Sequence, residues 1–268
     1  MRVTVCELSD NEIRFIEDWT KLKNHLKTYK PDLLLLPEMP FSKWIASEKN
    51  ADDATKVQSI QKHEKWMKEL EQLKVKYTVY SKPVIDGGKF FNTAFVYEKG
   101  LGHYKIHTKS LFPEEEHFWE ETWYDREEQS SFKLLEYGDI KIGVLLCTEM
   151  WFTEHAREYG KQGVDLLLCP RATGMASVNQ WIRCGQTLSV ISGAYCLSSN
   201  RSGQGDNDFQ WGGMGWIAKP MSGNTLGITS ADEKFITRDI DLSRSRAAKN
   251  EYPLYVKDDV WTYRPDRI

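Results

Sequence analysis

The sequence predicts an α/β fold, in which buried strands alternate with helices and carry polar residues at one edge. Residues 33–36 and 164–169 form apolar runs of strand length, and residues 33–36 are apolar on both faces, as in a central strand of a covered sheet. A third run, residues 142–146, stops abruptly at Cys147. Ligands of open α/β sheets bind at the C-terminal edge of the strands. The residues that follow these runs are therefore candidates for a functional site.

Composition narrows the classes of function. The 268 residues contain no linker, so we expect 1–268 to form a single domain. A formal net charge of −3 implies no bulk attraction to nucleic acid or to an anionic membrane. Five widely spaced cysteines, without a CxxC pair or a Cys/His cluster, favour neither disulfides nor a metal site. No signal-peptide pattern and no apolar run near the ~20 residues of a membrane span are present, so we expect a cytoplasmic protein.

The start of the chain predicts a strand, a helix and a second strand. Residues 1–8 alternate and are rich in valine, which favours a strand. Residues 10–29 predict a helix with Asp10 as its N-cap. The strand at residues 33–36 then leads through a proline to Glu38. The residues expected on the buried face of the helix are Ile13, Ile16, Trp19, Leu22 and Leu26.

The middle of the chain adds a helix and antiparallel strands. Residues 52–75 predict a long amphipathic helix that covers one face of the sheet. Residues 77–84 and 90–97 alternate, and the Asp-Gly-Gly segment at 86–88 between them is typical of a hairpin. Residues 104–109 predict a further strand, so antiparallel strands accompany the strand–helix units.

The second half of the chain repeats the strand–helix pattern. Helices are expected at residues 152–160 and over part of 178–192. Residues 203–215 predict a polar loop near the site, and residues 261–265 an extended arm that packs on a partner subunit. Strands are expected at residues 132–136, 140–146, 164–169, 194–199, 215–219 and 235–241.

Cys147 is the first candidate for chemistry. It stands at a strand-to-helix turn, where free N–H groups and the helix dipole favour a thiolate. Glu38 repeats this placement just beyond a buried strand, and Lys109 stands near the end of another. Taken singly, Cys147 also fits a buried core position, because free cysteines are among the most buried residues. Glu38, taken singly, also fits a surface loop.

These three residue types are sufficient for nucleophilic catalysis. A cysteine becomes a useful nucleophile when a base or a positive charge favours its thiolate. Glu38 can serve as the base. The Lys109 ammonium can stabilise the oxyanion that forms when the sulfur attacks a carbonyl or nitrile carbon.

In the chain order Glu38, Lys109, Cys147, the sequence resembles the nitrilase superfamily of carbon–nitrogen hydrolases, whose catalytic residues are Glu, Lys and Cys. Residues 33–38 are similar to the apolar strand and Pro-Glu of that family, and residues 142–149 to its Gly-x-x-x-Cys-x-(Asp/Glu) elbow. Further similarities are found at Glu154, Arg157 and residues 91–94, 169–170 and 263–265.

The segment around the lysine departs from the family pattern Tyr-Arg-Lys-x-His-Leu-Phe. Lys109 keeps the Leu-Phe that follows, whereas Lys105 keeps the Tyr and the x-His. Lys109 is preferred, because its distance to the following glutamates is nearer that of the family. The resemblance also implies a further glutamate near the site, for which Glu115 fits best and Glu116 is the second choice. A second departure lies at residues 183–186, where many members carry an Ala-Arg-Ala-x-Glu-Asn helix.

The resemblance implies an α-β-β-α sandwich and the cofactor-free hydrolysis of a non-peptide carbon–nitrogen bond, first of all in a small amide. Cys147 would form a thioester, Glu38 would transfer protons and Lys109 would stabilise the tetrahedral intermediate. Nitrilase, N-carbamoyl hydrolase and acyltransferase activities are alternatives, as is a non-catalytic binding protein with this fold. The expected partners are a small amide or nitrile and further copies of the chain in a homo-oligomer, a dimer or larger, without nucleic acid or membrane.

In the family, the segments after the elbow and after the next strand line the pocket. A buried guanidinium needs an anion beside it and binds a carboxylate well. Arg171 therefore predicts either a carboxylate on the substrate or an internal acidic partner such as Glu115. The residues expected to contact the substrate are Thr148, Met150, Trp151, Arg171 and Thr173.

Overall fold

The computed structural model describes residues 1–128 and 132–257, so the arm expected at 261–265 and the family similarity at 263–265 lie outside the described residues. No helix in the described ranges is long and apolar enough to cross a membrane. The helices of this part are α1 (Glu12–Tyr29), α2 (Asp53–Leu70), α3 (Glu120–Trp123), α4 (Thr153–Lys161), α5 (Val178–Ser192) and α6 (Leu242–Ala248), with short 3-10 helices η1 (Ile45–Ser47), η2 (Cys147–Trp151), η3 (Met175–Ser177) and η4 (Asp206–Asp208). The strands are β1 (Arg2–Ser9), β2 (Leu33–Leu35), β3 (Tyr77–Asp86), β4 (Lys89–Glu98), β5 (Gly102–Thr108), β6 (Leu135–Tyr137), β7 (Ile140–Val144), β8 (Leu166–Pro170), β9 (Tyr195–Gln204), β10 (Gln210–Gly212), β11 (Trp216–Ala218), β12 (Thr225–Ile228) and β13 (Phe235–Asp239).

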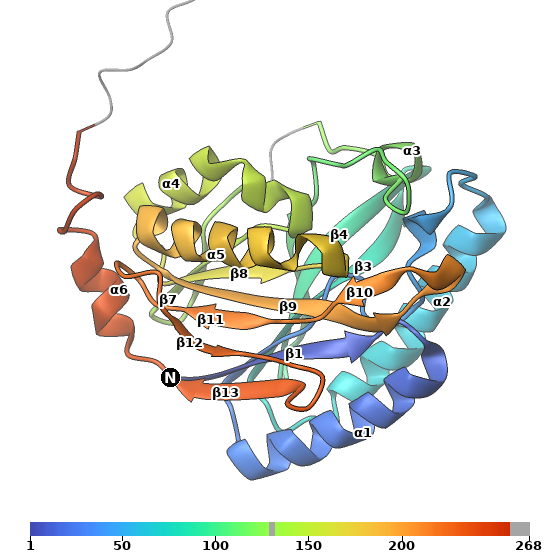
Figure 1. Cartoon of the computed structure of the whole chain (residues 1–268), viewed down its shortest axis with the longest axis horizontal. Helices are drawn as coiled ribbons and strands as arrows, with labels where there is room; N and C mark the ends of the chain where they lie inside the picture. Colours follow the sequence, from blue (N-terminus) through green and yellow to red (C-terminus); the bar gives the residue numbers. More distant parts are fainter. Residues whose placement is uncertain (129–131, 258–268) are drawn as a thin grey trace, which may run out of the picture.

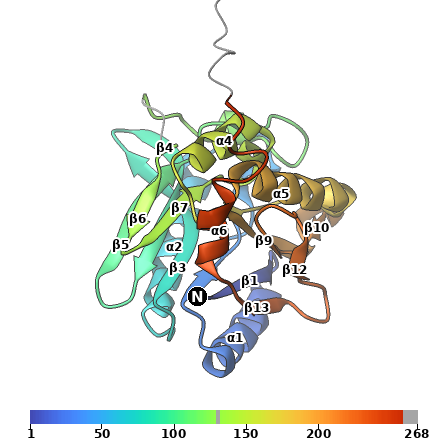
Figure 2. The same cartoon turned by 90° about the vertical axis from the view of Figure 1, so that its left-hand side faces the viewer.

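Two β-sheets pack face to face between two layers of helices (Figure 1, Figure 2). Helices α1 and α2 cover the outer face of the sheet that contains β1 to β5, and α4 and α5 cover the outer face of the other sheet. The α-β-β-α sandwich implied by the resemblance is therefore confirmed.

The strands follow the continuous order β5-β4-β3-β2-β1-β9-β8-β7-β6. In the first sheet β1, β2 and β3 are parallel, and the hairpin between β3 and β4 turns at Gly87 and Gly88, both with positive φ, as predicted. In the second sheet β7, β8 and β9 are parallel. The two sheets join where residues 7–9 of β1 pair with residues 200–202 of β9.

The apolar runs fill both sides of each sheet. Leu33 and Leu35 point into the core between the sheets, whereas Leu34 points toward α1 and α2. Leu166 and Leu168 likewise enter the central core, and Leu167 packs under α4 and α5. A strand between two packed layers must be apolar at every position, because its side chains alternate between the faces. Full burial of each such side chain contributes roughly 1.5–3 kcal/mol.

The buried face of α1 differs from the predicted one. Trp19, Leu22 and Leu26 are buried as expected, but Ile13 is 72% exposed and Ile16 is 51% exposed. The fourth buried apolar residue is Phe15. At 100° per residue, Ile13 and Ile16 lie about 150° and about 90° from the centre of this stripe.

The predicted cap of α1 is also wrong. Asn11 is the N-cap, and its side chain accepts hydrogen bonds from the backbone N–H groups of Ile13 and Arg14. Asp10 instead forms a buried ion pair with Arg201 and accepts a hydrogen bond from the backbone N–H of Trp44. Because Asp10 does not cap the helix, its carboxylate is available to pair with Arg201.

The second half of the chain contains elements that the sequence pattern did not predict. Strand β9 extends to Gln204, into the expected loop, where β10 pairs with it. Strand β12 pairs with β11, and α6 follows β13. Strands β10 and β12 are short, so they carry little periodicity, and their pairing partners define them.

Helix α5 packs closely on the second sheet at Gly185, within the segment that departs from the family pattern. A Cβ atom at this position would lie 2.5 Å from three atoms of the Trp216 indole. We expect Gly185→Ala to lower the free energy of unfolding by about 1–3 kcal/mol, although alanine favours helices. Urea denaturation measures the change. Thr187→Ala on the exposed side of α5 is the control, expected within about 0.5 kcal/mol of the wild type; an equally stable Gly185→Ala variant would contradict this packing.

Candidate active site

The candidate site lies where the loops after β2, β5, β7 and β8 meet at one edge of the sandwich. Glu38 follows β2, Lys109 follows β5 and Cys147 follows β7. The backbone N–H of Glu38 donates to the carbonyl oxygen of Arg171, which fixes the loop after β2 against the loop after β8. The sheet topology thus brings together residues that are far apart in the sequence.

A buried lysine connects two glutamates. Lys109 Nζ lies 2.9 Å from Oε1 of Glu38 and 2.8 and 2.6 Å from the two carboxylate oxygens of Glu120. These three side chains are at most 1% exposed. Asn92 donates a further hydrogen bond of 2.7 Å to the same oxygen of Glu38. Lys105, by contrast, is half exposed and pairs with Glu127.

The glutamate that contacts the lysine is Glu120, which sequence reasoning missed. Glu115 and Glu116 were the candidates, but both are exposed, and neither makes an ion pair with Lys109. The chain turns back between residues 115 and 118, where the two backbones pair, and this turn carries Glu120 at the start of α3 into the interior. No local signal singles it out, because Glu120, Glu121 and Thr122 all lie between Trp119 and the buried Trp123, and of these three Glu120 alone is buried.

Cys147 lies at the bottom of a pocket and is 3% exposed. Its φ is 48°, in the left-handed region that costs a non-glycine residue on the order of 1–3 kcal/mol. Burial and the nearby Glu38 carboxylate raise the pKa of the thiol, and the Lys109 ammonium only partly offsets them. This environment favours the thiol over the thiolate, so the sulfur needs a base to accept its proton.

The charges around Lys109 are coupled. Burial lowers the pKa of its ammonium, but the Glu120 and Glu38 carboxylates outweigh this and hold that pKa well above its ordinary value. Burial raises the pKa of Glu120 to about 8, with a further contribution from the Glu38 carboxylate and an opposing one from Lys109. Two carboxylates beside one ammonium leave a negative charge in excess, which favours a proton on Glu120.

Glu149 links the two sides of the site. Its Oε1 accepts a hydrogen bond of 2.8 Å from the backbone N–H of Ser110, next to Lys109. Its Oε2 accepts one of 2.8 Å from the backbone N–H of Leu146, next to Cys147, and lies 2.6 Å from Nε2 of His107. Because this carboxylate is fully buried, it holds the lysine segment and the cysteine turn at a fixed separation.

Arg201 holds the loop that carries Glu38, and no motif pointed to it. Its guanidinium donates to the carbonyl oxygens of Glu38 at 3.2 Å, of Ser42 at 2.9 Å and of Met39. The Asp10 carboxylate neutralises it, and the side chain is 2% exposed. Satisfied backbone carbonyls at this depth keep the irregular loop in one conformation.

A pocket that is partly open to solvent lies above Cys147. Of the residues expected to contact a substrate, Thr148 and Thr173 line it, whereas Met150 is fully buried in the core under α5 and Trp151 is exposed outside it. The residues around the cavity are Pro113, Glu115, Phe118, Glu120, Cys147, Thr148, Ala172, Thr173, Gly174, Ser177 and Trp181.

Arg171 does not reach this cavity. It is 1% exposed and donates to Oγ of Ser198 at 2.7 Å, to Oγ1 of Thr173 at 2.8 Å and to the carbonyl oxygen of Met214 at 2.9 Å. Its guanidinium also stacks 4.1 Å from the centre of the Trp216 ring. Burial lowers its pKa to about 10. Within the described residues its partners are neutral acceptors and an indole, and Glu115 is not among them.

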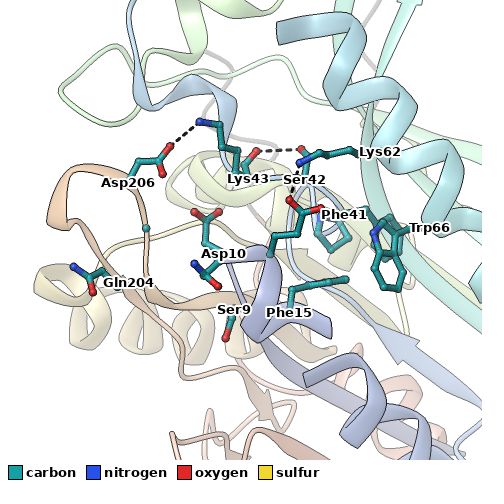
Figure 3. Close-up of a pocket in the computed structure, with 14 residues that line it drawn as sticks. Ser9, Asp10, Phe15, Phe41, Ser42, Lys43, Lys62, Trp66, Gln204 and Asp206 are labelled. Carbon is teal, nitrogen blue, oxygen red and sulfur yellow. Dashed lines mark hydrogen bonds and ion pairs between the residues drawn. The ribbon is translucent and has the colours of Figure 1, made fainter. Parts of the chain in front are cut away.

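A second cavity, also partly open to solvent, lies between α1, α2 and the loop after β9 (Figure 3). Phe15, Phe41 and Trp66 form its apolar side. Lys43 Nζ is paired with Asp206 at 2.8 Å, and Lys62 Nζ with Glu12 at 3.1 Å. The lining of this second cavity does not include Glu38, Lys109 or Cys147, and both lysines within it are paired with carboxylates of the protein itself. The cavity above Cys147 is therefore the stronger candidate for an active site.

A buried Glu-Lys pair beside a cysteine at a strand-to-helix turn is an arrangement that favours thiol-dependent acyl transfer. Residues 4–250 match the family described as carbon-nitrogen hydrolase, and the chain belongs to this family. It is 24% identical over 164 residues to N-carbamoylputrescine amidase of Solanum lycopersicum, covering 56% of this chain and 54% of that protein. It is 26% identical over 178 residues to an omega-amidase of Xenopus tropicalis, with coverages of 64% and 63%. The chain thus spans 54% of the length of the first of these curated relatives and 63% of the second, less than two thirds of either.

Solved structures share the fold over nearly the whole chain. The carbon-nitrogen hydrolase of Helicobacter pylori G27 superimposes with a TM-score of 0.81 at 19% identity, covering 95% of this chain and 94% of that one. A glutamate-to-glutamine variant of an amidase from Nesterenkonia sp. AN1 superimposes with a TM-score of 0.73 at 16% identity, and each chain is covered to 92%. That structure has the acetamide moiety of fluoroacetamide added covalently at its active site cysteine.

The raised pKa of Glu120 predicts how stability depends on pH. Between the ordinary glutamate value of about 4.3 and about 8, the folded protein holds a proton on this group that the unfolded chain releases. The contribution of this protonated group to the free energy of unfolding is therefore complete at low pH and is lost as pH rises toward 8. The free energy of unfolding falls by at most about 1.4 kcal/mol per pH unit over this range. Urea denaturation of wild type and Glu120→Gln across this range should show the slope in the wild type alone. Parallel curves would contradict the assignment, and Glu121→Gln on the exposed side is the control.

Proposed function

We propose that the protein hydrolyses the carbon–nitrogen bond of a small amide through a thioester on Cys147. The observation that carries this proposal is the buried contact of 2.9 Å between Lys109 and Glu38, beside the cavity that Cys147 lines. Membership of the carbon–nitrogen hydrolase family supports it, as do relatives named as amidases and a Nesterenkonia amidase that carries an adduct on its active site cysteine.

The first half of the reaction acylates the cysteine. Glu38 accepts the thiol proton as the sulfur attacks the amide carbon, and the carbonyl π electrons move to oxygen. The Lys109 ammonium stabilises this oxyanion. When the tetrahedral intermediate collapses, the carbon–nitrogen bond breaks, Glu38 returns the proton to nitrogen, and ammonia or an amine leaves.

The second half releases the acid. A water molecule gives a proton to Glu38 and attacks the thioester carbon, and Lys109 again stabilises the oxyanion. The carbon–sulfur bond then breaks, the sulfur takes the proton back, and the free acid leaves. Glu120 acts through Lys109: its two hydrogen bonds hold the ammonium beside Glu38, so we assign it a positioning role that Glu115 cannot fill.

A ureido substrate is the second candidate, because a relative is named N-carbamoylputrescine amidase and the same three groups could cleave a carbamoyl nitrogen. Nitrilase and acyltransferase activities require the same nucleophile, and no described contact favours them. A single domain over 1–268, a cytoplasmic location and a homo-oligomer stay predictions.

Replacing the nucleophile or the base should stop the reaction at different stages. We expect Cys147→Ala to abolish turnover. We expect Glu38→Gln to acylate slowly, because its amide cannot accept the thiol proton, and then to accumulate acyl-enzyme, because the amide cannot accept the proton of the attacking water either. Intact mass spectrometry after incubation with a small-amide library detects the thioester. Cys184→Ala, which removes another buried thiol, should keep turnover. Turnover by Cys147→Ala, or full multiple turnover by Glu38→Gln, would refute the assigned roles.

The two lysines give a matched comparison. Lys109→Met should lower kcat by about 100-fold or more, the usual loss when an oxyanion donor is removed. Lys105→Met should change kcat little, because Lys105 pairs with Glu127 at the surface. Steady-state kinetics on one amide, with circular dichroism to verify folding, distinguish the variants. A larger loss in Lys105→Met would reverse the assignment.

A further inference from the structure

The charges around the active-site cavity restrict the substrate. Two side chains of its lining end in carboxyl groups, Glu115 and Glu120. Both oxygens of Glu120 accept hydrogen bonds from Lys109, so Glu120 is engaged inside the protein. Glu115 is exposed and forms no ion pair within residues 1–128 and 132–257. It is therefore the charged group of the cavity wall that a ligand can meet.

The turn that holds Glu115 is well defined. The backbone N–H of Glu115 donates to the carbonyl oxygen of Phe118 at 3.2 Å, and the backbone N–H of Phe118 donates to the carbonyl oxygen of Glu115 at 2.8 Å. The neighbouring glutamates lie elsewhere: Glu114 accepts hydrogen bonds from Thr122, and Glu116 is 87% exposed and absent from the cavity lining. Residue 115 is thus the member of the acidic run that the fold places at the cavity.

Cations are missing from the same wall. No lysine or arginine belongs to the cavity lining in the described part of the chain. The guanidinium of Arg171 lies behind it, held by neutral acceptors and Trp216. Phe118 and Trp181 add aromatic rings to the lining, and such rings attract ammonium groups. A carboxylate on the substrate would meet Glu115 without a counter-ion.

We propose that the substrate carries an ammonium group several atoms from the scissile amide, and that Glu115 binds it. This reverses the expectation of a substrate carboxylate. The inference rests on the proposed amide hydrolysis and adds the charge of the substrate. Glu115 contributes to specificity and takes no part in the chemical steps.

Three amides of matched chain length test the proposal: δ-aminovaleramide with a terminal ammonium, hexanamide with a methyl group in its place, and adipamate with a carboxylate. For the wild type, kcat/KM should be about fivefold or more higher for δ-aminovaleramide than for hexanamide, and lowest for adipamate. The preference should decrease at about 0.5 M KCl, because salt screens an exposed ion pair.

Glu115→Gln is the decisive variant. The ratio of kcat/KM between δ-aminovaleramide and hexanamide should fall to about 1 in this variant. Glu116→Gln, which removes the adjacent charge outside the cavity, should keep the wild-type ratio. A wild type that prefers hexanamide or adipamate, or a Glu115→Gln variant that keeps the preference, would overturn the proposal.

A binding measurement separates this inference from the proposed function. Calorimetric titration of Cys147→Ala with δ-aminovaleramide and hexanamide reports charge recognition without turnover. Tighter binding of the cationic amide, lost in Cys147→Ala/Glu115→Gln, supports the inference even if the wild type cleaves none of the three amides. Equal binding of both amides contradicts it. Absence of turnover in the wild type counts against the proposed function alone.

Discussion

The arrangement of the candidate site depends on one buried ammonium group, that of Lys109. Lys109 is enclosed between the carboxylates of Glu38 and Glu120, and none of the three side chains is exposed to more than 1%. A buried charge without a partner costs several kcal/mol, so each of these groups is tolerated because the others are present. Their geometry must then be held from outside the cluster. Asn92 does so through the Glu38 carboxylate, and Arg201 through the backbone of the Glu38 loop.

The two sheets contribute different parts of the machinery. Glu38 and Lys109 follow strands of the first sheet, and Cys147 follows a strand of the second (Figure 1). The pairing of β1 with β9 joins the sheets, and the Glu149 carboxylate ties the two segments at the site. The core between the sheets therefore determines the distance between the Lys109 ammonium and the Cys147 thiol, as well as the stability of the fold. The reason is that a close-packed interior allows one sheet to slide little against the other.

Local sequence patterns predicted much of the fold and part of the site. Runs apolar at every position identified strands covered on both faces, and the residues after those strands included Glu38 and Cys147. The choice of Lys109 over Lys105 agrees with the burial of the first and the exposure of the second. The patterns did not predict the short strands β10 and β12, which are defined by the strands they pair with. They also assigned Ile13 to the buried face of α1, although this apolar residue lies on the exposed face.

What the sequence by itself determined is the set of positions at strand ends, because alternation of apolar residues and abrupt stops are local properties. The tertiary structure alone decided which charged groups meet. A turn at residues 115–118 selects Glu120 for Lys109, and Arg201 reaches a loop 163 residues away in the sequence. The partners of Arg171 likewise come from other strands and loops. Electrostatic partners depend on distance in space, and only the packing of the two sheets sets that distance.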